Sequence, residues 1–250
     1  MNKILGLWAT PRSTSTAFEK VMDHRGDMTC FHEPYNEAFY FGEERRVDRY
    51  FKADPELKPT KGLTLASVHK KMAALAETDK VFIKDFAYSI IHIADEQFLD
   101  AFTHTFLIRN PEKVLTSMHS RWPDVALGEI GFEDLHTLFT RIADKLGKAP
   151  PVIDSDELLD NVNAGMRAYC ESAGITFIPE AMNWQGSESI RENPTWNNDE
   201  HGFHDSLKSS KGFMKQKREY PPLSSSADMI RLYEASMPHY ESLFKHRLKF

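Results

Sequence analysis

The sequence lacks the residues on which several common protein classes depend. It contains only two cysteines, Cys30 and Cys170, which are too few for a disulfide scaffold and are not spaced as metal ligands. Its eleven histidines form no HExxH pattern, and His201 and His204 supply only two potential ligands, three residues apart. The sequence therefore predicts a reduced protein without a bound metal.

Long apolar runs and an excess of basic residues are also absent. No stretch approaches the ~18 apolar residues of a membrane span, and the apolar run Ile4–Ala9 is shorter than a signal-peptide core. The formal net charge is −6, whereas a general nucleic-acid binder would be strongly basic. We therefore expect a cytoplasmic protein that spans no membrane, binds no nucleic acid and holds any anionic ligand in a local basic pocket.

Apolar residues are nevertheless frequent enough for a sizeable core, at 41% of 250 residues, and we expect residues 1–250 to form a single domain. Short apolar runs, typical of buried strands, alternate with stretches of helical periodicity. The expected strands cover residues 3–9, 28–32, 81–84, 103–108 and 152–153. The expected helices cover residues 15–23, 64–77, 111–120, one from 154 or 155 to 174, and one after 224. This alternation predicts an α/β fold of three layers, with a central parallel sheet between helices.

Two segments, 39–61 and 182–222, show no clear periodicity and are rich in charged and aromatic residues, proline and glycine. Long irregular segments within a compact domain are often lids or binding loops. We expect these two segments to cover the ligand and to contribute to the substrate pocket.

A polar turn follows the first expected strand. It contains Arg12, Ser13, Thr14, Ser15 and Thr16, directly before the first expected helix. Backbone N–H groups at a helix start, hydroxyl donors and a guanidinium together suit a phosphate group. The GxxxxGK[ST] loop of kinases and GTPases is absent. An ordinary turn, in which Ser or Thr caps the helix, is the alternative interpretation.

A second candidate anion site follows the expected strand 103–108. Arg109 ends that strand, Asn110 can cap the next helix, and Ser117 lies eight residues after Arg109. Open α/β sheets bind ligands at the carboxyl ends of their strands, where Arg109 would lie. Alternatively, Arg109 pairs with a nearby carboxylate.

Together, the segments PRSTST and FLIRNPEKVLTSMHS resemble the two phosphate-binding motifs of sulfotransferases that use 3′-phosphoadenosine 5′-phosphosulfate (PAPS). The resemblance implies that loop 12–16 holds the 5′-phosphosulfate, with Arg12 at the leaving group, and that Arg109 and Ser117 hold the 3′-phosphate. A later segment, 203–213, is similar to the loop that closes over the 3′-phosphate and adenine, with Lys211 and Gly212 at its core. The resemblance runs along nearly the whole chain and is greatest to bacterial members.

The resemblance also implies catalytic residues. Several sulfotransferases carry a lysine at the strand end where this chain has Lys84, although a surface lysine with an extended stem is the alternative. The histidine that serves as base in animal cytosolic members is replaced here by Phe86. Some bacterial relatives have a glutamate after the second strand, which corresponds to Glu33; we expect Glu33 to be the base, with His32 as its rival or helper. The neighbouring Asp85 is expected to pair with Lys84.

These features predict a sulfotransferase that moves the sulfuryl group of PAPS to a hydroxyl or amine of a small-molecule acceptor and releases 3′-phosphoadenosine 5′-phosphate (PAP). Two other functions stay open from sequence alone. One is a non-catalytic PAP-binding module, because of Phe86, and the other is a small-molecule kinase with a loop resembling a P-loop.

Overall fold

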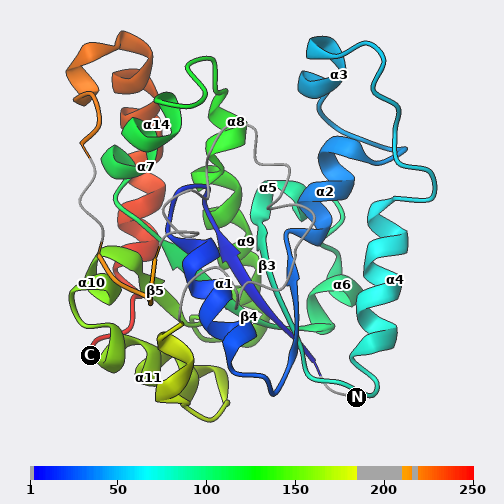
Figure 1. The fold of residues 1–250 in the computed structure, drawn as a ribbon, viewed down its shortest axis with the longest axis vertical. Helices are drawn as coiled ribbons and strands as arrows, with labels where there is room; N and C mark the ends of the chain where they lie inside the picture. Colours follow the sequence, from blue (N-terminus) through cyan, green and yellow to red (C-terminus); the bar gives the residue numbers. More distant parts are fainter. Residues whose placement is uncertain (1–2, 185–209, 216–218) are drawn as a thin grey trace.

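The computed structural model describes residues 3–184, 210–215 and 219–250. Its described residues form a parallel sheet with the strand order β2-β3-β1-β4-β5 (Figure 1). The strands are β1 (Ile4–Ala9), β2 (Thr29–His32), β3 (Val81–Phe86), β4 (Phe102–Ile108) and β5 (Val152–Asp154). All lie at the apolar runs expected from the sequence.

The helices surround this sheet (Figure 1). Those before β4 are α1 (Ser15–His24), α2 (Pro34–Phe41), α3 (Arg49–Ala53), α4 (Leu65–Leu75), α5 (Ala87–Ile90) and α6 (Glu96–Asp100). Those after β4 are α7 (Pro111–His119), α8 (Leu127–Ile130), α9 (Phe132–Leu146), α10 (Ser155–Asp160), α11 (Val162–Ala173), η1 (Pro179–Met182), η3 (Leu223–Ser225) and α14 (Ala227–Phe244).

Both faces of the sheet are buried. Along β1, Ile4 and Trp8 belong to the core beneath α4, α7, α9 and α14, whereas Leu5 and Leu7 belong to the core beneath α1 and α11. Alternate residues of a strand point to opposite faces, so this division places β1 between two layers of helices. The prediction of a three-layer α/β fold with a central parallel sheet is confirmed.

Two local expectations were wrong. The helix expected from Asp154 to Gly174 is two helices, because Asn161 interrupts it and its side-chain oxygen accepts a hydrogen bond from the Ala164 N–H at 3.3 Å, which caps α11. The segment 39–61 is not wholly irregular, since it contains the end of α2 and all of α3. Tyr40 within it is only 3% exposed.

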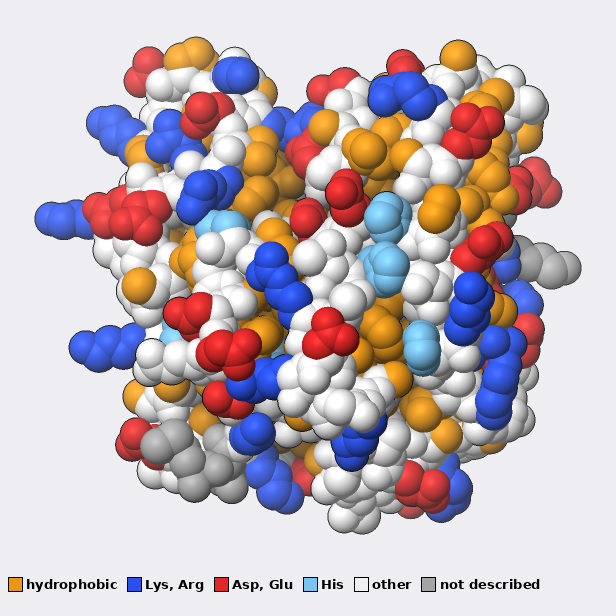
Figure 2. Space-filling model, turned by 180° about the vertical axis from the view of Figure 1, so that it is seen from behind, with side chains coloured by type: hydrophobic (Ala, Val, Ile, Leu, Met, Phe, Trp, Pro, Cys, Tyr) orange, Lys and Arg blue, Asp and Glu red, His pale blue; other side chains and the backbone are white. Residues whose placement is uncertain are grey.

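The strand order places the candidate residues at one edge of the sheet. β1 neighbours β3 and β4, and β2 neighbours β3, so residues directly after these strands emerge on the same side. Seen from behind, the molecule has a notch between two lobes at this end, and acidic and basic side chains are interspersed on this face (Figure 2). In the described part of the chain, no helix has the length and apolar character needed to cross a membrane.

Candidate functional site

The loop between β1 and α1 has an unusual backbone. Arg12 and Thr14 have φ values of 59° and 66°, in the left-handed region that non-glycine residues rarely adopt. Ser13 lies between them, fully buried, and its hydroxyl donates to the Thr10 carbonyl at 2.6 Å. Left-handed residues in a tight turn direct backbone N–H groups inward and often mark ligand sites.

The same loop leads directly into a helix start. Ser15 and Thr16 form the first turn of α1, where backbone N–H groups have no helical acceptor. The hydroxyl of Thr10, at the beginning of the loop, is buried and has no hydrogen-bond partner among the described residues. The sequence analysis did not single out Thr10, because a threonine at a strand end is common in the absence of any ligand. Together, the backbone N–H groups of the first turn and the Thr10 hydroxyl give the loop several hydrogen-bond donors that are not used within the helix.

The second segment has the geometry expected from its sequence. Arg109 follows β4, and the Asn110 side chain accepts a hydrogen bond from the Glu112 N–H at 2.9 Å, which caps α7. Pro111 occupies the first helical position. Ser117, two turns later, is only 2% exposed.

The two candidate anion-binding segments meet. Arg12 Nε donates to Ser117 Oγ at 3.0 Å, and Arg109 Nη1 donates to the backbone carbonyl of Arg12 at 2.8 Å. Ser117 Oγ in turn donates to the hydroxyl of Tyr220 at 3.1 Å. This convergence follows from the pairing of β1 with β4, which brings the ends of these two strands side by side.

The positive charge of this region is only partly offset. Arg109 Nε lies 3.5 Å from Asp156 Oδ1, an ion-pair distance, and in the described part of the chain this buried nitrogen has no hydrogen-bond partner. Lys113 lies closer to the same carboxylate, at 2.9 Å. The expected alternative, an ion pair of Arg109 with a carboxylate, is thus present alongside its contact with the first loop.

Lys84 lies at the centre of a second polar cluster. It is fully buried, so the alternative of a lysine reaching to the surface is wrong. Its ammonium forms an ion pair with Glu33 and lies 3.7 Å from Glu19 Oε2. In the pairing of β2 with β3, His32 lies opposite Lys84. This pairing explains why His32 and Glu33, which are 52 and 51 positions from Lys84 in the sequence, lie beside it.

Glu33 and His32 differ in their surroundings. Glu33 occupies the residue before α2 in a left-handed conformation, φ 46°, and its side chain is 17% exposed. The side chain of His32 is 3% exposed; its Nδ1 lies 2.6 Å from Glu19 Oε2, and its Nε2 lies 3.6 Å from Glu33 Oε1. Glu33 is thus the more accessible of the two candidate bases, and both adjoin Lys84.

Glu19 was missed from the sequence. It lies on the face of α1 that also buries Phe18 and Met22, and it is 4% exposed. An acidic residue on the apolar face of an amphipathic helix is the signal that would have indicated it, because such a group requires a buried partner. Here the partners are His32 and Lys84.

Asp85 does not pair with Lys84 as expected. Its carboxylate accepts hydrogen bonds from the backbone N–H groups of Tyr35 at 2.6 Å and Phe86 at 2.8 Å, and it is fully buried. Burial, reinforced by the charge of Glu33, raises the pKa of Asp85 to about 8. Asp85 therefore secures the start of α2, the helix that follows Glu33.

The late loop is held by backbone contacts. The Phe213 N–H donates to the Met182 carbonyl and the Trp184 N–H donates to the Lys211 carbonyl, each at 3.0 Å. A Cβ atom at residue 212 would lie 3.0 Å from the Met182 carbonyl oxygen, a tight contact that glycine avoids. The Lys211 side chain is exposed, and within the described residues no contact joins it to the two arginines or the serine. The rest of the expected loop, 203–209, lies outside the described residues.

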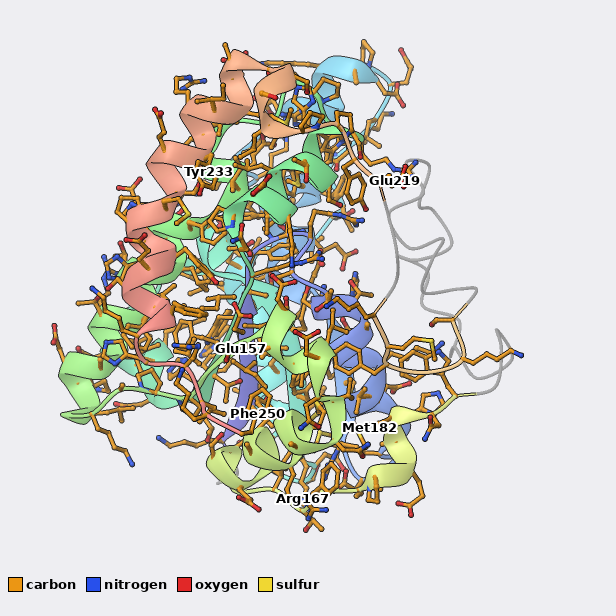
Figure 3. The ribbon with its side chains drawn as sticks, turned by 90° about the vertical axis from the view of Figure 1, so that its left-hand side faces the viewer. Glu157, Arg167, Met182, Glu219, Tyr233 and Phe250 are labelled. Atoms are coloured by element: carbon orange, nitrogen blue, oxygen red, sulfur yellow. The ribbon has the colours of Figure 1, made fainter. Side chains whose placement is uncertain are left out.

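The late loop nevertheless packs against α1, the helix that follows the first loop. The Phe213 ring contacts Phe18 of α1, and the buried Lys20 ammonium lies 4.5 Å from the centre of the Trp184 ring (Figure 3 shows Met182 beside this helix). Trp184 is only 2% exposed and its indole N–H donates to Ser210. Trp184 therefore supports the loop from within. Burial lowers the pKa of Lys20 to about 8.

The described residues form an α/β protein in which two arginine-bearing turns meet at one edge of the sheet. Residues 2–247 match the family model of the sulfotransferase domain, and the chain belongs to this family. The chain also matches the sulfotransferase domain of the Synechococcus PCC 7002 olefin synthase, with 16% identity over 99% of this chain and 96% of that one and a TM-score of 0.50. That likeness concerns the fold.

Curated relatives are longer proteins. The Arabidopsis thaliana branched-chain-amino-acid aminotransferase-like proteins 1 and 2 are 26% and 24% identical to this chain, each over 98% of its length. The chain spans 42% and 44% of those proteins, less than half of their length. More than half of each of those proteins lies outside this match.

Proposed function

We propose that the protein transfers the sulfuryl group of PAPS to a hydroxyl or amine of a small acceptor and releases PAP. The observation that carries this proposal is the meeting of Arg12, Ser117 and Arg109 at one edge of the sheet. Membership of the sulfotransferase family favours sulfuryl over phosphoryl transfer, and therefore disfavours the kinase alternative.

The donor set fits a nucleotide with phosphates at two positions. Loop 12–16 provides the helix start, hydroxyls and the Arg12 guanidinium, which suit the 5′-phosphosulfate. Arg109 and Ser117 would hold the 3′-phosphate. The buried Nε of Arg109 and the hydroxyl of Thr10, which have no hydrogen-bond partner within the described residues, would donate to an anion. We assign to Lys211 and Gly212 the closing loop, with Gly212 fixing its shape.

Transfer breaks the bond between sulfur and the phosphate oxygen and forms one between sulfur and the acceptor oxygen or nitrogen, while the acceptor loses its proton. Arg12 and Lys84 would stabilise the charge that grows on the leaving phosphate. Glu33 would take the proton, supported by its greater exposure and its contact with Lys84. His32, anchored by Glu19, would orient this cluster.

The acceptor site would lie in the notch seen in Figure 2, between the lobe that contains α2 and α3 and the lobe that contains α14. Segment 39–61, which contains α3, lies at this end of the molecule in Figure 1, which supports its assignment as a covering segment. Most of segment 182–222 lies outside the described residues. We expect a small-molecule acceptor.

Ligand binding tests the proposal directly. PAP should raise the thermal midpoint of the protein, because a ligand that binds only the folded state stabilises it by mass action. ATP should raise it much less, since it has no 3′-phosphate for Arg109 and Ser117. The Ser117→Ala variant should lose most of the difference between the two nucleotides. Equal shifts by PAP and ATP in the parent protein would contradict the assignment.

A transfer assay then separates an enzyme from a binding module. The protein is incubated with sulfur-labelled PAPS and a panel of alcohols, phenols, sugars and amines, and labelled products are counted. We expect a labelled product together with PAP in equal amount. Tight PAP binding without any labelled product, in a cell extract as well as in the panel, would support the non-catalytic module.

A further inference from the structure

One lysine outside the polar clusters described above carries a buried charge without a hydrogen-bond acceptor. Lys20 lies on α1 and is 1% exposed, and among the described residues its ammonium nitrogen has no hydrogen-bond partner. An ammonium that is removed from water without an acceptor costs stability, so such groups are rare unless a ligand completes them. The sequence analysis gave Lys20 no role.

The position of Lys20 connects two segments of the candidate nucleotide site. α1 begins at Ser15, directly after the first loop, and long side chains on a helix lean toward its N-terminus, so we expect the stem of Lys20 to run toward that loop. On its other side, the ammonium lies 4.5 Å from the centre of the Trp184 ring, whose indole N–H donates to the Ser210 carbonyl at 2.9 Å. Figure 3 shows Met182, two residues before this tryptophan, beside α1. The ammonium thus lies where α1 meets the late loop.

The chemistry of this contact leaves the ammonium able to bind a further group. A lysine ammonium has three N–H donors and no acceptor. The face of the Trp184 ring attracts the positive charge, but it offers no oxygen or nitrogen atom to these hydrogens. Because burial lowers the pKa of Lys20 only to about 8, most of the amine is protonated at pH 7. A ligand with an acceptor atom at this place would receive a charge-assisted hydrogen bond.

Adenine is the part of the proposed nucleotide to which no side chain has yet been assigned. The first loop and the pair of Arg109 and Ser117 are assigned to its two phosphates, and the late loop is similar to the loop that closes over the 3′-phosphate and adenine. Ring nitrogens of adenine accept hydrogen bonds, and proteins recognise unstacked bases through such contacts with their edges. Because Lys20 lies against the late loop, its ammonium is placed to donate to the base.

We infer that Lys20 recognises the base of the donor nucleotide by donating a hydrogen bond to a ring nitrogen of adenine. The inference rests on the proposed function, since it assigns a role within the same nucleotide site. It also explains why a lysine occupies a buried position where an apolar side chain of similar length would stabilise the protein without its ligand.

The first test compares the nucleotide with a counterpart that has no base. Dissociation constants for PAP and for ribose 3,5-bisphosphate, which carries phosphates but no adenine, are measured by calorimetric titration, with competition against PAP where the second ligand binds weakly. The variants are Lys20→Met and, as a matched control, Lys70→Met, which replaces an exposed lysine on α4. Circular dichroism melts without ligand establish that both variants are folded and give their thermal midpoints.

We expect Lys20→Met to bind PAP about tenfold more weakly, because a charge-assisted hydrogen bond is lost, and to bind ribose 3,5-bisphosphate as the parent protein does. Its thermal midpoint without ligand should be higher than that of the parent, whereas Lys70→Met should match the parent in all three measurements. Equal weakening with both ligands would mean that Lys20 binds a phosphate, and unchanged affinity for PAP would mean that it binds no part of the nucleotide. Either result would overturn the inference, and a lower midpoint would contradict the cost assigned to the buried charge.

The second test changes the ligand and leaves the protein intact. Three analogues of PAP, in which N1, N3 or N7 of adenine is replaced by C–H, are titrated into the parent protein and into Lys20→Met. One analogue should bind to the parent about tenfold more weakly than PAP does, and this difference should disappear in the variant. Equal binding of PAP and all three analogues to the parent would overturn the role of Lys20 and leave the proposed function standing. Failure of the parent protein to bind PAP would overturn both.

Discussion

Arg12 combines an uncommon backbone conformation with a side-chain contact to a residue distant in the sequence. Its backbone is left-handed, with φ 59°, and its side chain reaches a serine on a neighbouring helix. A single left-handed non-glycine residue costs about 1–2 kcal/mol, which the contacts of the loop must offset. The contacts of the Arg12 carbonyl with Arg109 and of its Nε with Ser117 supply that stabilisation.

Replacement of Arg12 tests its place at the leaving group. Arg12→Ala should lower kcat for sulfuryl transfer by about 100-fold or more, because a charge aimed at the developing anion is lost. The fold should persist, because alanine keeps the backbone carbonyl that accepts from Arg109, although the contact with Ser117 is lost. The matched control is Arg231→Ala, an exposed arginine on α14 paired with Asp228, which should leave kcat unchanged. Retention of more than about a tenth of the parent rate by Arg12→Ala would place this residue elsewhere.

Lys84 is the residue whose removal should damage the fold itself. Lys84→Met leaves the carboxylates of Glu19 and Glu33 without their buried counter-ion, and we expect a loss of about 3–5 kcal/mol in the free energy of unfolding. The control is Lys80→Met, whose side chain is 65% exposed and lies 3.7 Å from Asp27; it should cost less than about 1 kcal/mol. Urea unfolding measures both. Equal costs for the two variants would mean that the cluster around Lys84 does not depend on its charge.

At the scale of elements, the packing of α14 on α9 contains a titratable contact. His136 Nδ1 on α9 and His239 Nδ1 on α14 lie 3.1 Å apart, so one ring must be neutral and accept a hydrogen bond from the other. Burial lowers the pKa of His136, and the neighbouring His239 and His246 lower it further. The folded protein therefore binds a proton at His136 less readily than the unfolded chain does.

This contact should make stability depend on pH. In the unfolded chain, His136 takes up a proton with a pKa of about 6.5. The stabilisation of the folded state by neutral His136 is therefore complete above that pH, and it is lost as the pH falls through the lower pKa of the folded state. Chemical unfolding at pH 7.5 and pH 5.5 measures the loss for the parent and for His136→Gln, which should lose less on acidification. His239→Gln, which removes the hydrogen-bond partner, should act in the same direction. An identical loss in all three proteins would exclude a role for the pair.

At the scale of the whole molecule, the sequence was most informative where burial is nearly continuous. The strands β1, β3 and β4 are buried on both faces, so their apolar runs are visible without any knowledge of the fold. The break between α10 and α11 was missed because it depends on a local competition, in which Asn161 caps a new helix instead of continuing the old one. Helix α9 was not predicted, although its buried residues Leu135, Leu138, Phe139 and Ile142 have helical spacing.

The candidate site also contains some residues that could be predicted from the sequence and others that could not. Loop 12–16 and the Arg109–Ser117 pair were visible because each motif is local in sequence, and the structure brings them together. Glu19 and Lys20 were not visible, because each acts through a contact with residues distant in the chain. Spacing alone carries no information on such contacts. Their positions are set by strand order and helix packing.

The strand order also bears on how the chain acquires its structure during synthesis. The middle strand, β1, precedes both of its neighbours, and the nearer of them, β3, begins 77 residues after β1 begins. When β1 has left the ribosome it has no partner, and its apolar side chains stay accessible until β3 and β4 have been made. Pairings between distant segments are slow to form. A nascent chain stalled before residue 81 should therefore bind ribosome-associated chaperones, and a chain that extends past β4 should release them.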